Sequence, residues 1–268
     1  MEYKNNRLSI FISSPASYLD VFDIWFTCYR KFWANSEYSV VKATDLSVKN
    51  YPNIDVVFSG KENDGWVDRS IPFLRQIESK YILLMCDDIF IVDFVENEKI
   101  EEILNFMDKY NVHFCRLSPT KRGRKAQKNI KFLPLRMPYA KNLQFGIYNK
   151  EYLLNEFKEN SETAWNVENR WNKESLLSPK GFYTDVIGIQ KPIMKYVHGI
   201  NKSKWYPSAI NKISKLGIEI RSERRVMTRI EEIRLNFIGN IGAYFAPRFR
   251  FKIKRILKRF GIKFHTEY

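Results

Sequence analysis

The sequence predicts an α/β fold in which a mixed, mostly parallel sheet is flanked by helices. Two observations carry this prediction. Short apolar runs alternate along the chain with longer segments whose apolar residues recur every three or four positions. One run, 80–86 (KYILLMC), is continuously apolar, as expected for a strand buried on both faces of a parallel sheet.

The first part of the chain opens with a predicted buried strand at 8–13 (LSIFIS), which Ser13-Ser14-Pro15 ends. Apolar residues at helical spacing predict a helix over 18–33 that packs on the sheet. Two further short strands are expected at 39–43 and 55–59, with a turn-rich stretch between them.

The middle of the chain continues the alternation. A helix is expected over 66–79, then the apolar strand 80–86, then an amphipathic helix over 98–110 and a strand at 113–117. The resulting order, β-α-β-β-α-β-α-β, predicts a layered α/β domain with a largely parallel sheet.

The second half of the chain is less regular. The basic segment 119–131 lacks periodicity and is predicted to be a mobile loop. The other expected elements are a strand at 142–148, helices at 150–157 and from 164, a hairpin of 182–191 with 194–198, a loop at 199–204, and a helix at 206–216 that Gly217 ends.

The charge of the chain predicts an anionic partner. The formal net charge is +15, and residues 221–268 hold 13 Lys or Arg against 4 Asp or Glu. Within this tail, Phe249 to Phe260 places apolar residues on one helical face among basic ones, which is typical of helices that lie on anionic membranes. A helix packed on its own domain, or on a partner, is the alternative. We therefore expect a domain at 1–220 and a basic amphipathic tail at 221–268.

The cysteines and the termini bear on the compartment. Cys28, Cys86 and Cys115 form no metal-binding or disulfide spacing, so we expect buried thiols in a reducing compartment. No signal-peptide pattern and no apolar run of about 20 residues is present. The expected location is cytoplasmic, peripheral to the inner face of a membrane.

The strongest local signal for chemistry is the acidic pair Asp87-Asp88 at the end of the apolar strand. In open α/β sheets, ligands bind at the carboxyl ends of strands. Two adjacent carboxylates repel each other unless a cation neutralises them, and a divalent metal holding a diphosphate would do so. The alternative is one Asp that caps a turn and one that is solvated.

Several segments together resemble bacterial glycosyltransferases of the GT-A fold from surface-polysaccharide clusters. The match runs from about Ile10 to Met227, and its order and spacing are more specific than any one piece. The acidic pair replaces the spaced D-x-D motif usual in that family. The resembling pieces are YLD at 18–20, GWVDR at 65–69, YILLMCDDIF at 81–90, QFGIY at 144–148, KEYLL at 150–154, WNVE at 165–168, KWYPSA at 204–209 and LGI at 216–218.

The resemblance implies a site for a nucleotide-sugar donor, with a UDP-sugar as the default, and a divalent cation, Mn²⁺ or Mg²⁺. Glu168 is implied as the general base of an inverting transfer to a glycan or lipid-linked acceptor. The implied nucleotide contacts are Ser13, Tyr18, Asp20, Asp68, Arg69, Asp87 and Lys204, and the implied metal ligands are Asp88 and His198.

Simpler interpretations stay open for these residues. Glu168 is equally compatible with an acid on a helix surface, and Trp165 with a buried core residue rather than a sugar platform. His198 is also compatible with a solvated loop residue, and Lys202, Lys204 and Arg69 with ordinary surface charges.

Two other functions compete with the enzyme. The basic charge with interleaved aromatics suits a nucleic-acid-binding protein, although no recognition motif is visible and we expect no nucleic-acid partner. An inactive transferase-like scaffold at a membrane is the second. The sequence has no P-loop, dinucleotide-binding glycine motif, H-E-x-x-H or G-x-S-x-G, which argues against the enzyme classes built on them.

Overall fold

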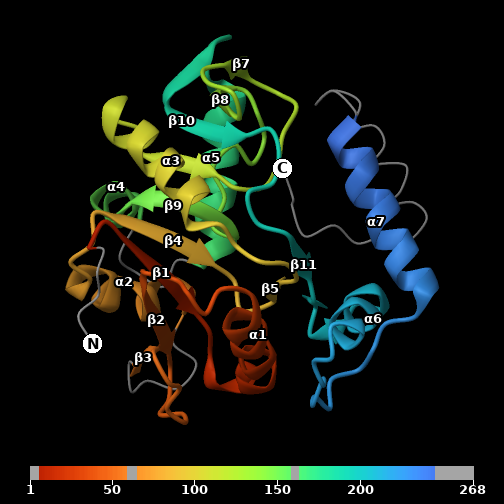
Figure 1. Cartoon of the computed structure of the whole chain (residues 1–268). Helices are drawn as coiled ribbons and strands as arrows, with labels where there is room; N and C mark the ends of the chain where they lie inside the picture. Colours follow the sequence, from red (N-terminus) through yellow and green to blue (C-terminus); the bar gives the residue numbers. More distant parts are fainter. Residues whose placement is uncertain (1–5, 59–64, 158–162, 245–268) are drawn as a thin grey trace. The chain divides into compact units, whose positions relative to one another are not determined.

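The computed structural model describes residues 6–58, 65–157 and 163–244 (Figure 1). Their contacts divide these residues into two units: the first holds 6–198 and 213–222, and the second holds 199–212 and 223–244. The boundary falls inside helix α6. The predicted membrane-surface helix at 249–260 lies outside the described residues.

A nine-stranded mixed sheet forms the centre of the first unit, in the order β3-β2-β1-β4-β9-β6-β10-β8-β7. Seven strands run in one direction, and only β8 and β9 run against them. The strands are β1 (Leu8–Ser13), β2 (Ser39–Thr44), β3 (Asp55–Phe58), β4 (Tyr81–Met85), β6 (Phe114–Arg116), β7 (Arg124–Lys125), β8 (Ile130–Pro134), β9 (Phe145–Asn149) and β10 (Phe182–Ile189).

Helices cover both faces of this sheet (Figure 1). α2 (Trp66–Gln76), α4 (Lys150–Glu156) and α5 (Ala164–Leu177) share one core with the strands. α1 (Leu19–Phe32), which follows the short helix η1 (Ala16–Tyr18), and α3 (Asn97–Lys109) lie on the other face. The structure confirms the predicted fold class, a mixed and mostly parallel sheet flanked by helices.

Smaller elements complete the described chain. β5 (Ile89–Ile91) pairs with β11 (Tyr196–His198) in the first unit, and β12 (Ile200–Asn201) pairs with β13 (Lys204–Trp205) in the second. α6 (Pro207–Lys215) ends near Gly217, whose φ of 73° is the left-handed conformation expected after a helix. α7 (Arg229–Tyr244) is the last described helix. No helix of the described chain is both long and apolar enough to cross a bilayer.

Two predictions for the second half of the chain are wrong. The segment 119–131, predicted to be a mobile loop, contains β7 and the start of β8, which form a hairpin at the sheet edge. Exposed cations occupy many of its positions, so the segment lacks a clear strand pattern of apolar residues. A strand pair at the edge of a sheet needs apolar residues on only one face. The segments 182–191 and 194–198 do not pair with each other: β10 lies between β6 and β8, and β11 pairs with β5. These partners are distant in sequence and leave no local signal.

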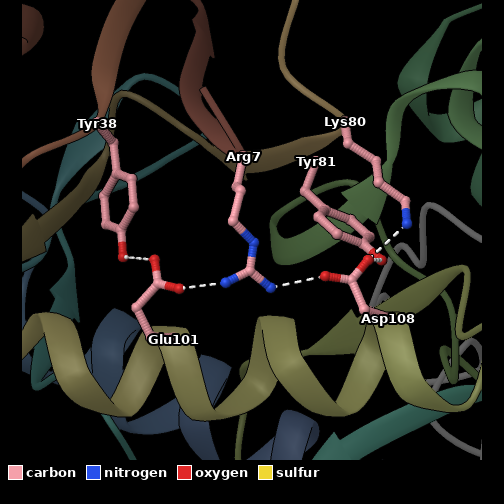
Figure 2. Close-up of polar contacts among 6 residues, drawn as sticks. All are labelled: Arg7, Tyr38, Lys80, Tyr81, Glu101 and Asp108. Carbon is pink, nitrogen blue, oxygen red and sulfur yellow. Dashed lines mark hydrogen bonds and ion pairs between the residues drawn. The ribbon is translucent and has the colours of Figure 1, made fainter. Parts of the chain in front are cut away.

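A polar network fastens α3 to the amino-terminal ends of the strands (Figure 2). The Arg7 guanidinium donates to Glu101 and to Asp108, each at 2.6 Å. Asp108 also accepts from Lys80 Nζ at 2.5 Å and from Tyr81 Oη at 2.8 Å. One carboxylate thus ties the helix to the residues that begin β1 and β4.

We expect Asp108→Asn to lower the free energy of unfolding by about 1–2 kcal/mol, because three charge-assisted hydrogen bonds weaken together. Urea denaturation followed by circular dichroism measures the change. Glu96→Gln is the control, since Glu96 pairs with Lys99 on the surface and its replacement should change stability by less than about 0.5 kcal/mol. Equal effects of both substitutions would contradict a structural role for the network.

Candidate functional site

The chain order reverses beside β1, with β2 on one side and β4 on the other. All three strands run in the same direction, so their carboxyl ends meet at one edge of the sheet. Open α/β sheets bind ligands at such a point. The residues that follow these strands are Ser14 after β1, Asp45 after β2, and Asp87 and Asp88 after β4.

Ser13 and Arg69 are brought together at this edge. Arg69 lies in the first turn of α2 and is almost fully buried, and its Nε donates to Ser13 Oγ at 3.1 Å. Ser14 is also buried, and its backbone N–H donates to Ala43 O of β2 at 2.8 Å. Two of the predicted nucleotide contacts therefore form one buried polar pair at the predicted place.

Asp45 belongs to the same cluster, although the sequence analysis did not select it. Its Oδ1 accepts from the backbone N–H of Ala16 at 2.7 Å and of Leu46 at 3.0 Å. Burial would raise the pKa of Asp45, but these hydrogen bonds and the Arg69 charge outweigh burial and hold that pKa below its usual value. The available signal was a carboxylate two residues after the strand predicted at 39–43, similar to the signal that singled out Asp87.

The acidic pair lies in the turn between β4 and β5. Asp87 is buried and Asp88 is half-buried. Burial, and then the negative charge of Asp87, raise the pKa of Asp88 to about 7. The charge of Asp87 thus disfavours the ionisation of Asp88, and a bound cation would offset that repulsion.

Lys42 places a positive charge beneath this cluster. Val41 and Ala43 face the core shared with α2, so Lys42 faces the opposite side of β2. There its fully buried Nζ has no hydrogen-bond partner among the described residues and lies 4.2 Å from the centre of the Phe22 ring. Burial lowers the pKa of Lys42 to about 8, while negative charges, Asp87 foremost, oppose the shift.

We expect Lys42→Met to raise the free energy of unfolding by about 2 kcal/mol at pH 7, because the methionine removes a buried charge but keeps the apolar stem. The folded-state pKa lies below that of an unfolded lysine, so wild-type stability rises between about pH 8 and pH 10.5. The gain should therefore shrink across that range, as urea denaturation at pH 7 and pH 10 would show.

Lys49→Met is the matched control for this substitution. Lys49 is exposed and pairs with Asp23 at 2.7 Å, so its replacement should change stability by less than about 1 kcal/mol at either pH. A Lys42→Met protein that is less stable than wild type at pH 7 would show that the buried lysine serves the fold instead.

Glu168 is buried in α5, which excludes the surface-acid alternative. Its Oε1 accepts from the backbone N–H of Leu143 at 2.7 Å. Burial raises the pKa of Glu168 to about 7, against the lowering effects of this hydrogen bond and of the Arg116 charge. A carboxylate that titrates near neutral pH suits proton transfer, and it also anchors the loop before β9.

Cys86 connects Glu168 with the acidic pair. Its Sγ lies 3.8 Å from the carbonyl oxygen of Leu143, the residue whose backbone N–H donates to Glu168. Burial raises the pKa of the Cys86 thiol, and nearby negative charges raise it further. Those charges belong to Asp88, Asp87 and Glu168, so the predicted base and the predicted diphosphate site both act on this thiol.

The predicted metal ligands lie near each other in the strand pairing. His198 ends β11, in register with Ile89, the residue after Asp88. It is the last residue of this strand and is exposed. Within the described part of the chain, no three His, Cys, Asp or Glu side chains are grouped closely enough to hold a metal ion. Mg²⁺ sites for nucleotides commonly use one or two carboxylates plus phosphate oxygens, so Asp87 and Asp88 fit such an ion.

The other predicted contacts have the following positions and partners. Asp20 in the first turn of α1 accepts from Ser222 Oγ at 2.5 Å, and Tyr18 ends η1 just before it. Asp68 precedes Arg69 in α2 and is half-buried. Lys204 belongs to the second unit, where its Nζ pairs with Glu231 at 3.0 Å.

Trp165 and the cysteines complete the comparison with the sequence. Trp165 is 58% exposed at the start of α5, so the buried-core alternative is wrong and a surface platform remains open. Cys28 and Cys115 are buried and Cys86 is partly buried, and all three are free thiols as predicted.

Neither a family model nor a curated protein matches this chain. Among solved structures, it is similar to TarS from S. aureus in complex with UDP, at 14% identity and a TM-score of 0.49, covering 78% of this chain and 64% of that one. A longer TarS structure gives 13% identity and a TM-score of 0.49, covering 78% and 38%.

The mannosyltransferase PcManGT from Pyrobaculum calidifontis, in complex with GDP-Man and Mn²⁺, is similar at 10% identity and a TM-score of 0.44, covering 69% of this chain and 55% of that one. The chain thus spans less than two thirds of the length of these solved structures. At such identities and TM-scores, the likeness by itself assigns neither a reaction nor a substrate to this chain.

Proposed function

We propose that the chain is a glycosyltransferase that transfers a hexosyl group from a nucleotide-diphosphate donor to a glycan or lipid-linked acceptor of surface polysaccharide synthesis. One observation carries this proposal. The polar groups at the carboxyl edge of β1, β2 and β4 join an anion-binding arginine, an acidic pair and a buried carboxyl group that titrates near pH 7.

The residues divide into two parts in this proposal. Ser13, Asp45 and Arg69 bind the nucleoside, with a uridine diphosphate sugar as the first candidate donor. Asp87 and Asp88 would hold Mn²⁺ or Mg²⁺, which would supply positive charge at the departing diphosphate. The position of this pair directly after β4, at the edge where the strands end, supports the assignment, and a bound cation would offset the repulsion that raises the pKa of Asp88.

Glu168 acts as the base of an inverting transfer. Its carboxylate accepts the proton of the acceptor hydroxyl while that oxygen forms a bond to the anomeric carbon. The bond from that carbon to the diphosphate oxygen breaks, and the diphosphate keeps the electron pair. The Leu143 N–H holds one carboxylate oxygen, so the other is available for the proton.

A thermal-shift screen of nucleotide sugars with and without Mn²⁺ tests the proposal. The cognate donor at 100 times its Kd should stabilise the protein by about 2.7 kcal/mol, with the effect depending on Mn²⁺. Two outcomes would contradict the proposal. A protein that no nucleotide sugar stabilises would be an inactive scaffold, and RNA binding that survives about 200 mM salt would indicate a nucleic-acid-binding protein.

We also propose that residues 221–268 form a separate basic segment that holds the enzyme at the cytoplasmic face of the inner membrane, near a lipid-linked acceptor. The sequence supports this proposal, since more than half of the net charge lies there. Vesicle sedimentation of a chain truncated after Met227 tests it, and unchanged sedimentation would exclude the role.

A further inference from the structure

The hairpin of β7 and β8 forms a strongly basic edge of the sheet, at the far end from β3 (Figure 1). From Pro119 to Lys150 the sequence contains no Asp or Glu. Among the described residues, no carboxylate pairs with Lys125 or Lys128. The exposed cations of this surface, here called the basic edge, are Lys121, Arg122, Arg124, Lys125 and Lys128, with Lys180 and Lys191 beside them.

Exposed apolar side chains lie next to these cations. Phe182 is 41% exposed, pairs with Pro134 of β8, and has the Arg124 guanidinium 5.6 Å from its ring centre. Leu177 ends α5 and is 87% exposed. Its neighbour Ser178 accepts a 2.6 Å hydrogen bond from Arg136 Nε, just after β8. These contacts place Phe182 and Leu177 beside the carboxyl end of β8, in the same strand pair that carries the cations.

Protection of an exposed sheet edge does not account for this combination. Lysines on an edge strand discourage pairing with other chains, but an exposed leucine and phenylalanine beside them work against that purpose. A nucleic acid would use the cations and could stack a base on Phe182, yet it gains little from Leu177. A lipid surface uses both kinds of group, since cations meet anionic headgroups and apolar side chains enter the hydrocarbon boundary.

We propose that the basic edge is a docking surface for an anionic phospholipid membrane, separate from the tail at 221–268. Lys125 and Lys128 contact the headgroups, and Leu177 and Phe182 enter the outer hydrocarbon layer. This contact presents the first unit, rather than only the tail, to the bilayer surface.

Sedimentation of the full chain with vesicles of phosphatidylcholine containing phosphatidylserine tests this docking surface. Each basic residue near an anionic bilayer contributes about fivefold to partitioning, so Lys125→Gln with Lys128→Gln should weaken binding about 25-fold. Leu177→Ser should weaken it about tenfold, because a leucine side chain no longer leaves water. Circular dichroism and the melting temperature should stay as in wild type, since all three side chains are exposed.

Arg30→Gln with Lys109→Gln is the matched control. It removes the same charge from exposed positions in α1 and α3 and should change partitioning less than about twofold. If both double variants lost vesicle binding equally, the net charge alone would explain the effect and the proposal would be overturned. Unchanged vesicle binding of Lys125→Gln with Lys128→Gln would also overturn it, and weaker RNA binding by that variant would then assign the surface to nucleic acid.

Discussion

Replacing Asp88 with Asn should reduce sugar transfer by about 10²–10³-fold while making the folded protein more stable. The loss follows from the proposed role of Asp88 in neutralising the departing diphosphate through a cation. The gain follows from burial and the charge of Asp87, which together raise the pKa of Asp88 to about 7. The substitution removes a buried charge that destabilises the folded protein, so the free energy of unfolding rises. Such destabilising groups are common at functional sites.

The stability change should depend on pH with a definite sign. The folded-state pKa of Asp88 lies above its ordinary value of 3.8, so the folded protein binds more protons than the unfolded chain between about pH 4 and pH 7. Wild-type stability attributable to Asp88 therefore falls as the pH rises through that window. We expect Asp88→Asn to raise the free energy of unfolding by about 1–3 kcal/mol at pH 8, and by much less at pH 4.

Two measurements check this pair of effects. Steady-state kinetics with the donor found by thermal shift gives kcat/KM, and urea denaturation at both pH values gives stability. Asp93→Asn is the control, because Asp93 pairs with Lys195 on the surface shortly after β5 and should leave transfer unchanged. An Asp88→Asn protein with wild-type kcat/KM would remove Asp88 from the site.

Replacing Glu168 with Gln should lower kcat by about 10²–10⁴-fold, since an amide cannot accept the acceptor proton. Gln still offers an oxygen to the Leu143 N–H, so the loop before β9 should keep its position. The substitution thus separates the proposed base from the loop anchor that the structure shows directly.

The pH profile gives a second test of Glu168. The wild-type rate should rise as the pH passes about 7, because only the ionised carboxylate accepts a proton. This rise should be absent in Glu168→Gln. Glu174→Gln, at an exposed position of the same helix, is the control and should keep both rate and profile. Full activity in Glu168→Gln would leave Glu168 with its anchoring role alone.

The sequence predicted the alternating part of the fold well. The apolar runs that became β1, β2, β3, β4 and β6, and the periodic segments that became α1, α2 and α3, lie close to their predicted bounds. Each of these elements buries one or both of its faces. Burial therefore fixes the spacing of the apolar residues within each segment, and that spacing is visible in the sequence. α2 ends at Gln76 rather than at Ser79, because Ile77 is already extended.

The sequence also proposed Ser13, Arg69, Asp87 and Asp88 for one site: Asp87 and Asp88 because they follow a buried strand, and Ser13 and Arg69 by resemblance to a known family. The structure brings Ser13 and Arg69 into contact. It missed Asp45 and Lys42. Asp45 carries the same strand-end signal but follows a shorter apolar run. Lys42 is an unremarked cation within a strand, and only the packing of Phe22 against β2 makes it a fully buried charge.

By itself, then, the sequence determined the α/β class, the strand that presents Asp87-Asp88, and the basic character of the chain, since each depends on local burial or charge. Only the tertiary structure decided that β11 pairs beside Asp88, that the cations of 119–131 form a sheet edge, and that Glu168 is buried near Cys86. Those outcomes depend on contacts between segments far apart in the chain, which no local pattern of residues records.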